Sequence, residues 1–199
     1  MVNPPVMIGL TGTHHTGKTI IARRIEMELR AIGFTVTRTG GLARRAAELG
    51  FPKMLHHTAE STEWIITAGA ATALEAGRSA DVVLVDRTPH DALAYYAAAL
   101  KQRGEHFEGD DAERLSSVVD ALTRRYTLLL ATVLDPEIPL GEHPRKDPAY
   151  LDPGYRTAVD QILFRSLDDA GTAHTAVTSS SHDAAVQAAM AAVMQAVIA

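Results

Sequence analysis

The sequence predicts a three-layer α/β fold with a parallel sheet of about five strands. Short apolar runs alternate along the chain with amphipathic helical segments, which is the pattern of parallel strands joined by right-handed crossover helices. The first run leads directly into a glycine-rich loop and then a helix. The 199 residues can form a substantial core, and no repeat or linker divides them, so we expect a single domain over 1–199.

The segment from Gly12 to Thr19 matches the phosphate-binding loop pattern G-x-x-x-x-G-K-[ST] without a mismatch. The apolar run from Val6 to Thr11 is typical of a buried strand, and the helical spacing after the loop ends at Gly33. Glycines let successive N–H groups turn inward, where the helix dipole also favours an anion. We therefore predict that the phosphates of ATP contact Gly12, Thr13, His14, His15, Thr16, Gly17, Lys18 and Thr19.

Two side chains of this loop have the chemistry that phosphoryl transfer requires. Lys18 supplies a positive charge for the β- and γ-phosphates, so we predict a catalytic role for it. The Thr19 hydroxyl is a hard oxygen ligand that suits Mg²⁺. The loop therefore predicts ATP and Mg²⁺ as cofactors and a phosphate-loop NTPase fold.

Beyond the first helix, the pattern predicts a second strand over 34–39 and a short helix over 42–49. A longer helix is predicted over 59–77, with Thr58 as its N-cap. Its inward face is predicted to consist of Ile66, Ala70, Ala73 and Leu74.

The next strand, over 81–86, is almost purely aliphatic, as expected for a central parallel strand covered on both faces. It ends in Asp86. Thr88, Pro89 and Asp91 then have the residue types of the N-cap, the first position and the third position of a helix.

The rest of the chain continues the alternation. After a polar loop over 104–110, a helix is predicted around Leu115 and Val119, followed by a strand over 126–133. Residues 135–152 are rich in proline and charge, so we predict a lid loop that orders over bound nucleotide. Asp152 is expected to cap the next helix. A last strand over 172–178 and a helix from Ser181 complete the chain, and this helix is predicted to bury Val186, Met190, Val193 and Val197.

Ligands of such sheets bind at the carboxyl ends of the strands, where Asp86 lies. We predict that Asp86 is catalytic, as a partner of Mg²⁺ and a candidate general base; a helix-capping acid is the alternative. Arg44 and Arg87 are predicted to bind the substrate, although Arg87 could instead form a surface salt bridge. Arg145 in the lid loop is predicted to close on the γ-phosphate, and with Lys146 it could instead be a solvated charge cluster.

The histidine pairs at 14–15 and 56–57 are tempting as metal ligands, but neither pair has a third ligand at zinc spacing. We expect His56 and His57 to lie at the surface or at a helix entry. For His14 and His15 we expect the backbone to matter more than the side chain.

Composition restricts the partners and the location. The net charge of -5, without a basic tract, gives no indication of a nucleic-acid partner. The absence of cysteine fits a reducing compartment, and neither a signal peptide nor a membrane-length apolar run is recognisable, so we expect a cytoplasmic protein. The expected partner is a small-molecule phosphoryl acceptor, with no membrane, and a homodimer is left open.

Several segments together resemble the AAA-type ATPase/kinase family related to the ribosylnicotinamide kinase domain of NadR. They are the glycine loop, Ala43-Arg44 with Gly50-Phe51-Pro52, Val85-Asp86-Arg87-Thr88 with Tyr95, and Pro139 to Arg145 with Tyr155-Arg156 and Val159-Asp160. This resemblance implies a kinase acting on a nucleoside-like acceptor. Such proteins often carry a glutamate three residues before the arginine, where this chain has Gly41. Either Asp86 is then the base, or there is no base and the phosphoryl acceptor is not a neutral hydroxyl.

We therefore predict an ATP-dependent small-molecule kinase that transfers the γ-phosphate of Mg-ATP to a nucleoside, a nucleotide or a similar metabolite. The first alternative is a phosphate-loop NTPase that uses hydrolysis as a switch. The second is a nucleotide-binding module without catalysis.

Overall fold

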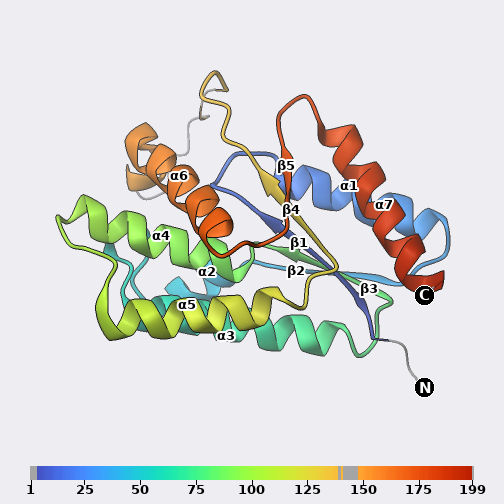
Figure 1. The fold of residues 1–199 in the computed structure, drawn as a ribbon, viewed down its shortest axis with the longest axis horizontal. Helices are drawn as coiled ribbons and strands as arrows, with labels where there is room; N and C mark the ends of the chain where they lie inside the picture. Colours follow the sequence, from blue (N-terminus) through green and yellow to red (C-terminus); the bar gives the residue numbers. More distant parts are fainter. Residues whose placement is uncertain (1–3, 139, 141–147, 199) are drawn as a thin grey trace.

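The computed structural model describes residues 4–138, 140 and 148–198. Among them, five parallel strands form one sheet in the order β2-β3-β1-β4-β5 (Figure 1). The strands are β1 (Val6–Thr11), β2 (Val36–Thr39), β3 (Val82–Asp86), β4 (Leu128–Thr132) and β5 (Thr175–Val177). The helices are α1 (Lys18–Ala31), α2 (Leu42–Glu48), α3 (Ala59–Ala76), α4 (Pro89–Gln102), α5 (Gly109–Thr123), α6 (Pro153–Asp169) and α7 (His182–Ile198). The predicted fold class is confirmed.

Helices cover the sheet on both faces, which gives three layers (Figure 1). On one face, alternate residues of β1 and β3 such as Ile8 and Leu84 pack against α1 and α7. On the other face, Val83 and Val85 lie over α3, and Leu129 and Ala131 of β4 pack against α4 and α6. The three central strands β1, β3 and β4 therefore bury both of their faces, which explains their uninterrupted apolar runs in the sequence.

The strand order positions the phosphate loop. β1 lies between β3 and β4, and Leu10 pairs with Asp86 in the β1–β3 register. The loop after β1 therefore begins beside the last residue of β3, and both lie at the carboxyl edge of the sheet, where ligands bind in folds of this kind.

The predicted helix starts are confirmed. The Thr58 hydroxyl accepts a hydrogen bond from the Ser61 N–H at 3.2 Å, and the Asp152 carboxylate accepts one from the Tyr155 N–H at 2.8 Å. At the start of α4, the Thr88 N–H donates to the Asp91 carboxylate at 2.7 Å. These contacts satisfy backbone N–H groups that have no partner inside the helix.

Several details differ from the sequence-based expectation. Val197 was predicted to face inward but is 52% exposed, in the last turn of α7. Leu74 shares the predicted face with Ile66, Ala70 and Ala73, since all four border one cavity, but it is 49% exposed. The helix α5 begins at Gly109, inside the predicted polar loop. The end of the predicted lid loop forms a 3₁₀ turn over Pro148–Leu151, whereas Arg145 and Lys146 lie outside the described residues.

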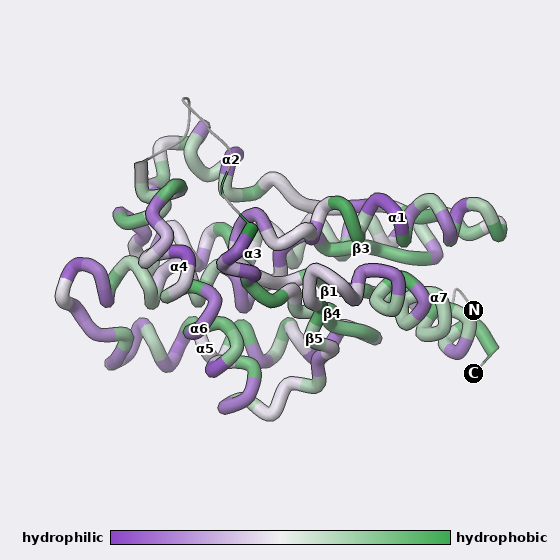
Figure 2. The backbone as a smooth tube through the Cα atoms, turned by 90° about the horizontal axis from the view of Figure 1, so that it is seen from above, coloured by the Kyte–Doolittle hydropathy of each residue, from purple (hydrophilic) through white to green (hydrophobic). Residues whose placement is uncertain are grey.

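Figure 2 shows the hydropathy of each residue along the chain, with hydrophobic strands at the centre of the molecule and hydrophilic stretches on the surrounding helices. In the part of the chain that the structure describes, no helix combines the length and the apolar character needed to cross a membrane.

Candidate functional site: the phosphate loop and the adjoining cavity

The loop between β1 and α1 has the backbone conformation that its glycines predict. Gly17 is the N-cap of α1 with a φ of 87°, and a Cβ there would lie 2.8 Å from the imidazole ring of His182. Gly12 has a φ of 140°, and a Cβ there would collide with Thr132. Only glycine fits these two positions. The free N–H groups at the start of α1 therefore face the loop, which favours a bound anion.

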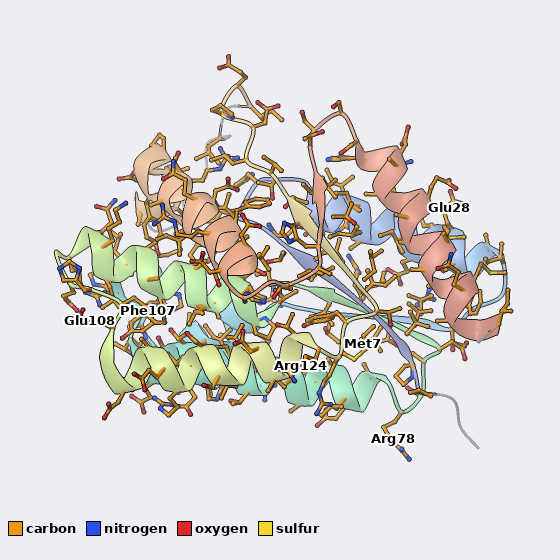
Figure 3. All side chains as sticks on the ribbon, viewed as in Figure 1. Met7, Glu28, Arg78, Phe107, Glu108 and Arg124 are labelled. Atoms are coloured by element: carbon orange, nitrogen blue, oxygen red, sulfur yellow. The ribbon has the colours of Figure 1, made fainter. Side chains whose placement is uncertain are left out.

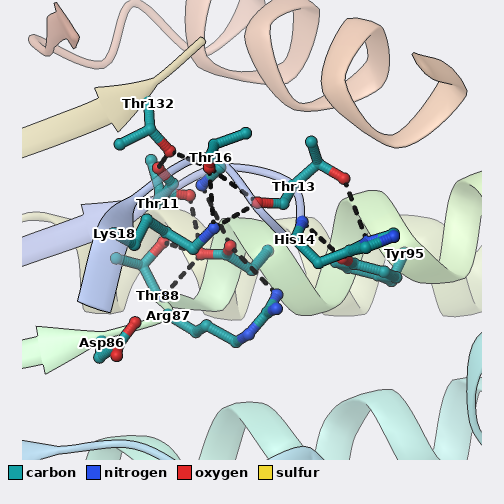
Figure 4. Close-up of polar contacts among 12 residues, drawn as sticks. Thr11, Thr13, His14, Thr16, Lys18, Asp86, Arg87, Thr88, Tyr95 and Thr132 are labelled. Atoms are coloured by element: carbon teal, nitrogen blue, oxygen red, sulfur yellow. Dashed lines mark hydrogen bonds and ion pairs between the residues drawn. The ribbon is translucent and has the colours of Figure 1, made fainter. Parts of the chain in front are cut away.

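Lys18 folds back over the loop instead of extending into solvent (Figure 4). Its ammonium donates to the carbonyl of Thr13 and, at 3.2 Å, to the hydroxyl of Thr16, and the residue is only 5% exposed. Burial lowers the pKa of Lys18 to about 7, and the positive charge of Arg87 acts in the same direction. A phosphate group would supply the negative charge that this buried ammonium lacks.

Asp91 fixes the first residues of the loop from the start of α4. Its buried carboxylate accepts hydrogen bonds from the Thr11 hydroxyl at 2.7 Å and from the Gly12 N–H at 3.1 Å. On the other side of the loop, the Thr132 hydroxyl donates to the Thr11 carbonyl at 3.0 Å and lies 2.5 Å from the Thr16 hydroxyl. The loop is thus held by β4 and α4 before any ligand binds.

The predicted pair of metal ligands is brought together. The hydroxyl of Thr19, in the first turn of α1, donates to Asp86 Oδ2 at 2.8 Å. Thr19 and Asp86 are 67 residues apart in sequence, and they meet because β1 and β3 are neighbours. Hydroxyl and carboxylate oxygens are hard ligands of the kind Mg²⁺ prefers, and Mg²⁺ usually completes its shell with waters and substrate phosphates. The pair therefore fits the predicted magnesium site.

A cavity of about 620 Å³ adjoins this pair, and Asp86, Arg87 and Arg44 all border it. The guanidinium of Arg87 lies 5.3 Å from the centre of the Tyr95 ring, and 3.8 Å separate it from the Asp91 carboxylate. Arg44 is highly exposed and lies 3.8 Å from Glu48, one turn further along α2. The structure thus brings the two predicted substrate-binding arginines to the same cavity as the predicted base.

The side chain of His14 has a structural role that the sequence-based interpretation missed. The His14 N–H donates to the Tyr95 hydroxyl at 3.0 Å, and that hydroxyl lies 2.7 Å from His14 Nδ1. The other ring nitrogen, Nε2, lies 2.8 Å from the carbonyl of Tyr150. These contacts fit one neutral tautomer, in which Nε2 donates and Nδ1 accepts. Burial lowers the pKa of His14 to about 3, so the ring stays neutral.

This histidine connects the phosphate loop to the end of the predicted lid segment. Its ring stacks on the ring of Tyr150, with the centroids 4.4 Å apart. Arg156, near the start of α6, forms two further hydrogen bonds with the phosphate loop. It donates to the carbonyls of His14 at 3.2 Å and His15 at 3.1 Å, and it is only 5% exposed. His15 itself is exposed and has a φ of 58°.

His57 was expected at the surface or at a helix entry; it lies at the entry of α3, directly before the N-cap Thr58, and is buried, with 4% exposure. It borders the cavity, and its Nδ1 lies 3.5 Å from the Ser61 hydroxyl. Burial lowers the pKa of His57 to about 4, and the charge of Arg103 contributes in the same direction. The surface alternative is excluded because the short turn at Met54–His56 packs against α4 and His57 is buried, a consequence of tertiary contacts.

The local backbone conformation explains why position 41 is a glycine. Gly41 is the N-cap of α2 with a φ of 77°, a conformation in which a glutamate would be strained. The neighbouring Gly40 approaches the backbone of Asp86 so closely that a Cβ there would lie 3.1 Å from the Asp86 carbonyl. An acid at position 41 is therefore disfavoured by the backbone, which leaves Asp86 as the carboxylate that ends a strand beside the phosphate loop.

The sequence-based analysis missed the roles of Tyr95 and Arg156 in holding the loop, and it recognised Asp91 only as a helix-capping residue. Their partners in the loop are between 79 and 142 residues away. Tyr95 and Arg156 did fall within the segments that carry the family resemblance, which was the available signal. Within the described ranges, no group of three or more His, Cys, Asp or Glu residues could hold a metal ion by itself.

Comparisons with known proteins support the fold. No protein-family model matches the chain, and no curated protein matches it by sequence. Among solved structures, a match is the crystal structure of NadR protein in complex with NR, with a TM-score of 0.62 and 17% sequence identity. The match covers 96% of this chain and 50% of that one, so this chain spans about half the length of that protein. At this identity the likeness supports a phosphate-loop-like fold and not a specific family.

Proposed function

We propose that the protein is a Mg-ATP-dependent kinase that transfers a phosphoryl group to a small-molecule acceptor. The observation that carries the proposal is the contact between Thr19 and Asp86, 2.8 Å long, at the junction of the phosphate loop and the 620 Å³ cavity. A nucleotide-binding module without a reaction would need the loop but not a carboxylate facing an adjoining cavity. The structural likeness to NadR fits this proposal at the level of the fold.

In this proposal, the loop and the start of α1 bind the phosphates of ATP. The N–H groups at the start of α1 point toward the β-phosphate, and Lys18 leaves its two loop acceptors to contact the β- and γ-phosphates. Mg²⁺ held by Thr19 and Asp86 would neutralise charge on the phosphates. Arg156, and Arg145 from the lid loop, would supply further positive charge around the γ-phosphate.

The two carboxylate oxygens of Asp86 are assigned different roles, one toward Thr19 and one toward the acceptor. Oδ2 accepts the Thr19 hydroxyl, whereas the described residues offer Oδ1 no hydrogen-bond donor. We assign Oδ1 to the acceptor hydroxyl. The acceptor oxygen forms a bond to the γ-phosphorus, the bond from that phosphorus to the β,γ-bridging oxygen breaks, ADP leaves, and the hydroxyl proton passes to Asp86. Arg44 and Arg87 would orient the acceptor at the cavity mouth.

The test measures ATP binding and acceptor-dependent ADP release separately. We expect calorimetry to show Mg-ATP binding that Asp86→Asn largely retains. In a panel of small hydroxyl compounds, we expect ADP release with some acceptors, and Asp86→Asn should reduce this turnover by about 10²–10⁴-fold because a positioned base is lost. The exposed Glu48→Gln, at the same cavity, is the matched control for loss of a nearby carboxylate.

ADP release at the same rate with and without every acceptor would contradict the kinase proposal and favour a hydrolytic switch. Unchanged turnover in a folded Asp86→Asn variant would show that Asp86 only accepts the Thr19 hydrogen bond.

A further inference from the structure

We infer that the acceptor is an amphiphilic alcohol, with a hydroxyl at one end and an aromatic or aliphatic body that occupies the deep part of the cavity. The inference rests on the proposed kinase function for the identity of the reacting end. It goes beyond that function because it names the chemical class of the acceptor.

The cavity extends far beyond the reacting edge of the sheet. It begins at Asp86, the last residue of β3, and reaches Met7 in β1, which pairs with Val83. Three residues of strand separate these levels, which corresponds to about 10 Å. Figure 3 shows Met7 in the amino-terminal part of β1, near the end of α5 that Arg124 marks. The cavity thus runs beneath the sheet from its carboxyl edge toward its amino edge.

Polar and apolar groups are segregated along this length. The three acidic residues that border the cavity, Glu48, Asp86 and Asp91, all lie toward the carboxyl edge, on α2, β3 and the start of α4. Farther in, the walls consist mainly of apolar side chains, among them Met7, Ile66, Ala70, Ala73 and Leu122. The far end adds the ring of Tyr126 and the exposed Arg125. The carboxylates that could accept a hydrogen bond from a ligand hydroxyl therefore lie at one end of the cavity only.

The deep part is hollow because small residues of two helices face each other across it. Ala70 and Ala73 of α3 and Ala92 of α4 border the cavity where larger side chains would fill it, whereas Gly69 leaves room for Leu42 of α2, which a Cβ there would approach to 2.9 Å. Above them, Val85 of β3 contributes only a short side chain. Protein interiors are close-packed, and an apolar void loses dispersion contacts on all its walls. A cavity of this size, within the range of ligand sites, is therefore suited to an apolar occupant.

A ribonucleoside does not match these walls. Its sugar and base carry donors and acceptors along the whole length of the molecule, and each would need a partner after burial. The deep part offers few partners beyond the Tyr126 hydroxyl, and burial raises the pKa of Tyr126, so that this group stays neutral. A phenyl or alkyl body requires no partner and gains free energy from each buried methylene.

The experiment uses a series of ω-phenyl-n-alkanols with increasing chain length, compared with ribonucleosides and hexoses. We expect kcat/KM for ADP release to rise about three- to fourfold per added methylene until the cavity is filled. The longer alkanols should also raise the melting temperature of Asp86→Asn, which binds without turnover. This second measurement is independent of kinase activity.

Two neighbouring alanines on α3 provide matched variants. Ala70 borders the cavity, whereas Ala71 is exposed on the outer side of the helix. Ala70→Leu should lower kcat/KM for the longest alkanols at least tenfold, with ATP affinity and the shortest alkanol unchanged. Ala71→Leu should change none of these values.

The outcomes separate this inference from the proposed function. Turnover of ribonucleosides or hexoses, with no dependence on alkanol length and no effect of Ala70→Leu, would overturn the inference and leave the kinase proposal standing. A length-dependent rise in melting temperature that Ala70→Leu abolishes, without ADP release from any acceptor, would support the apolar site and contradict the kinase proposal.

Discussion

On one face of the sheet, β1 and β3 pack against α1 and α7, whereas on the other face they border the cavity beside α3 and α4. The first face is filled by branched aliphatic side chains, including Ile21, Ile25 and Leu29 of α1, all fully buried. The second face has Gly69, Ala70 and Ala73 opposite Val85 and keeps about 620 Å³ open. One strand can therefore support a rigid layer and a binding cavity at the same time, because successive side chains point to opposite faces.

The two faces also differ in charge. Buried aliphatic side chains form the core between the sheet and the helices α1 and α7, the ring of Phe34 packs against it, and one ring nitrogen of His182 is buried at the start of α7. The buried histidines His14, His57 and His90 and the buried carboxylate of Asp91 all contact α4 or border the cavity on the other side. The cavity side therefore holds buried polar groups and is less closely packed than the other side, as is common where a site needs preorganised groups. Three predictions test this difference.

The largest expected effect is acid destabilisation of the cavity side. The folded-state pKa values of about 3 for His14 and about 4 for His57 lie below the value of 6.5 for a free histidine. The unfolded chain therefore binds more protons below pH 6.5, and the free energy of unfolding falls as the pH is lowered from there. At pH 5 each histidine should cost about 2 kcal/mol.

Denaturant titrations between pH 7 and pH 4.5 would measure this loss. His57→Gln should flatten the pH dependence, and His56→Gln, at the exposed neighbouring position, should not. Hydrogen exchange at pH 5 should accelerate in α4 before α1 and α7. Equal acceleration in all three helices would contradict the assignment of the acid sensitivity to one face.

The second prediction concerns Lys18, whose buried charge lies between the two faces. The pKa of Lys18 in the folded state is about 7, below the value of 10.5 for a free lysine. Below pH 7 the folded state must bury a charged ammonium, and the free energy of unfolding is lowered by the full amount. As the pH rises from 7 toward 10.5, this loss of stability disappears. Lys18→Met should therefore raise the free energy of unfolding at pH 6.5 by about 1–3 kcal/mol. It should also weaken Mg-ATP binding by about 1.5–3 kcal/mol, since a charge-assisted contact is lost.

Calorimetry checks both parts of this prediction for Lys18. In the wild type at pH 8, ATP binding should take up a proton, which appears as a dependence of the binding enthalpy on the buffer. Arg23→Met, on the exposed side of α1, is the matched loss of a positive charge. Tight ATP binding by a folded Lys18→Met variant would show that Lys18 does not bind the phosphates.

The smallest effect compares two valines of β3. Val82 is fully buried in the cluster with α1 and α7, whereas Val85 borders the cavity on the opposite face. Val82→Ala should cost about 2–3 kcal/mol because it leaves a new void in a filled layer, and Val85→Ala about 1 kcal/mol because the void already exists. Urea denaturation of both variants measures the difference. Equal losses would show that the cavity face is packed as tightly as the other.

The sequence predicted the elements well because their signals are local. The phosphate loop is recognised from eight consecutive residues, and the start of α4 from Thr88, Pro89 and Asp91. The strand over 81–86 and the helix over 59–77 were predicted to within one residue of β3 and α3. Where a prediction failed, as for the exposed Val197, helical spacing alone could not define how far along the helix the buried stripe extends.

The sequence alone predicted the phosphate-loop chemistry of Lys18 and Thr19 and determined the order of strands and helices, because periodicity and glycine placement act over a few residues. Only the tertiary structure decided which strands are neighbours, and with that the meeting of Thr19 with Asp86. It also decided that His14 is held by Tyr95, 81 residues away, and that small residues of α3 leave a cavity beside β3. Contacts at such separations depend on the packing of whole layers, which a local pattern does not encode.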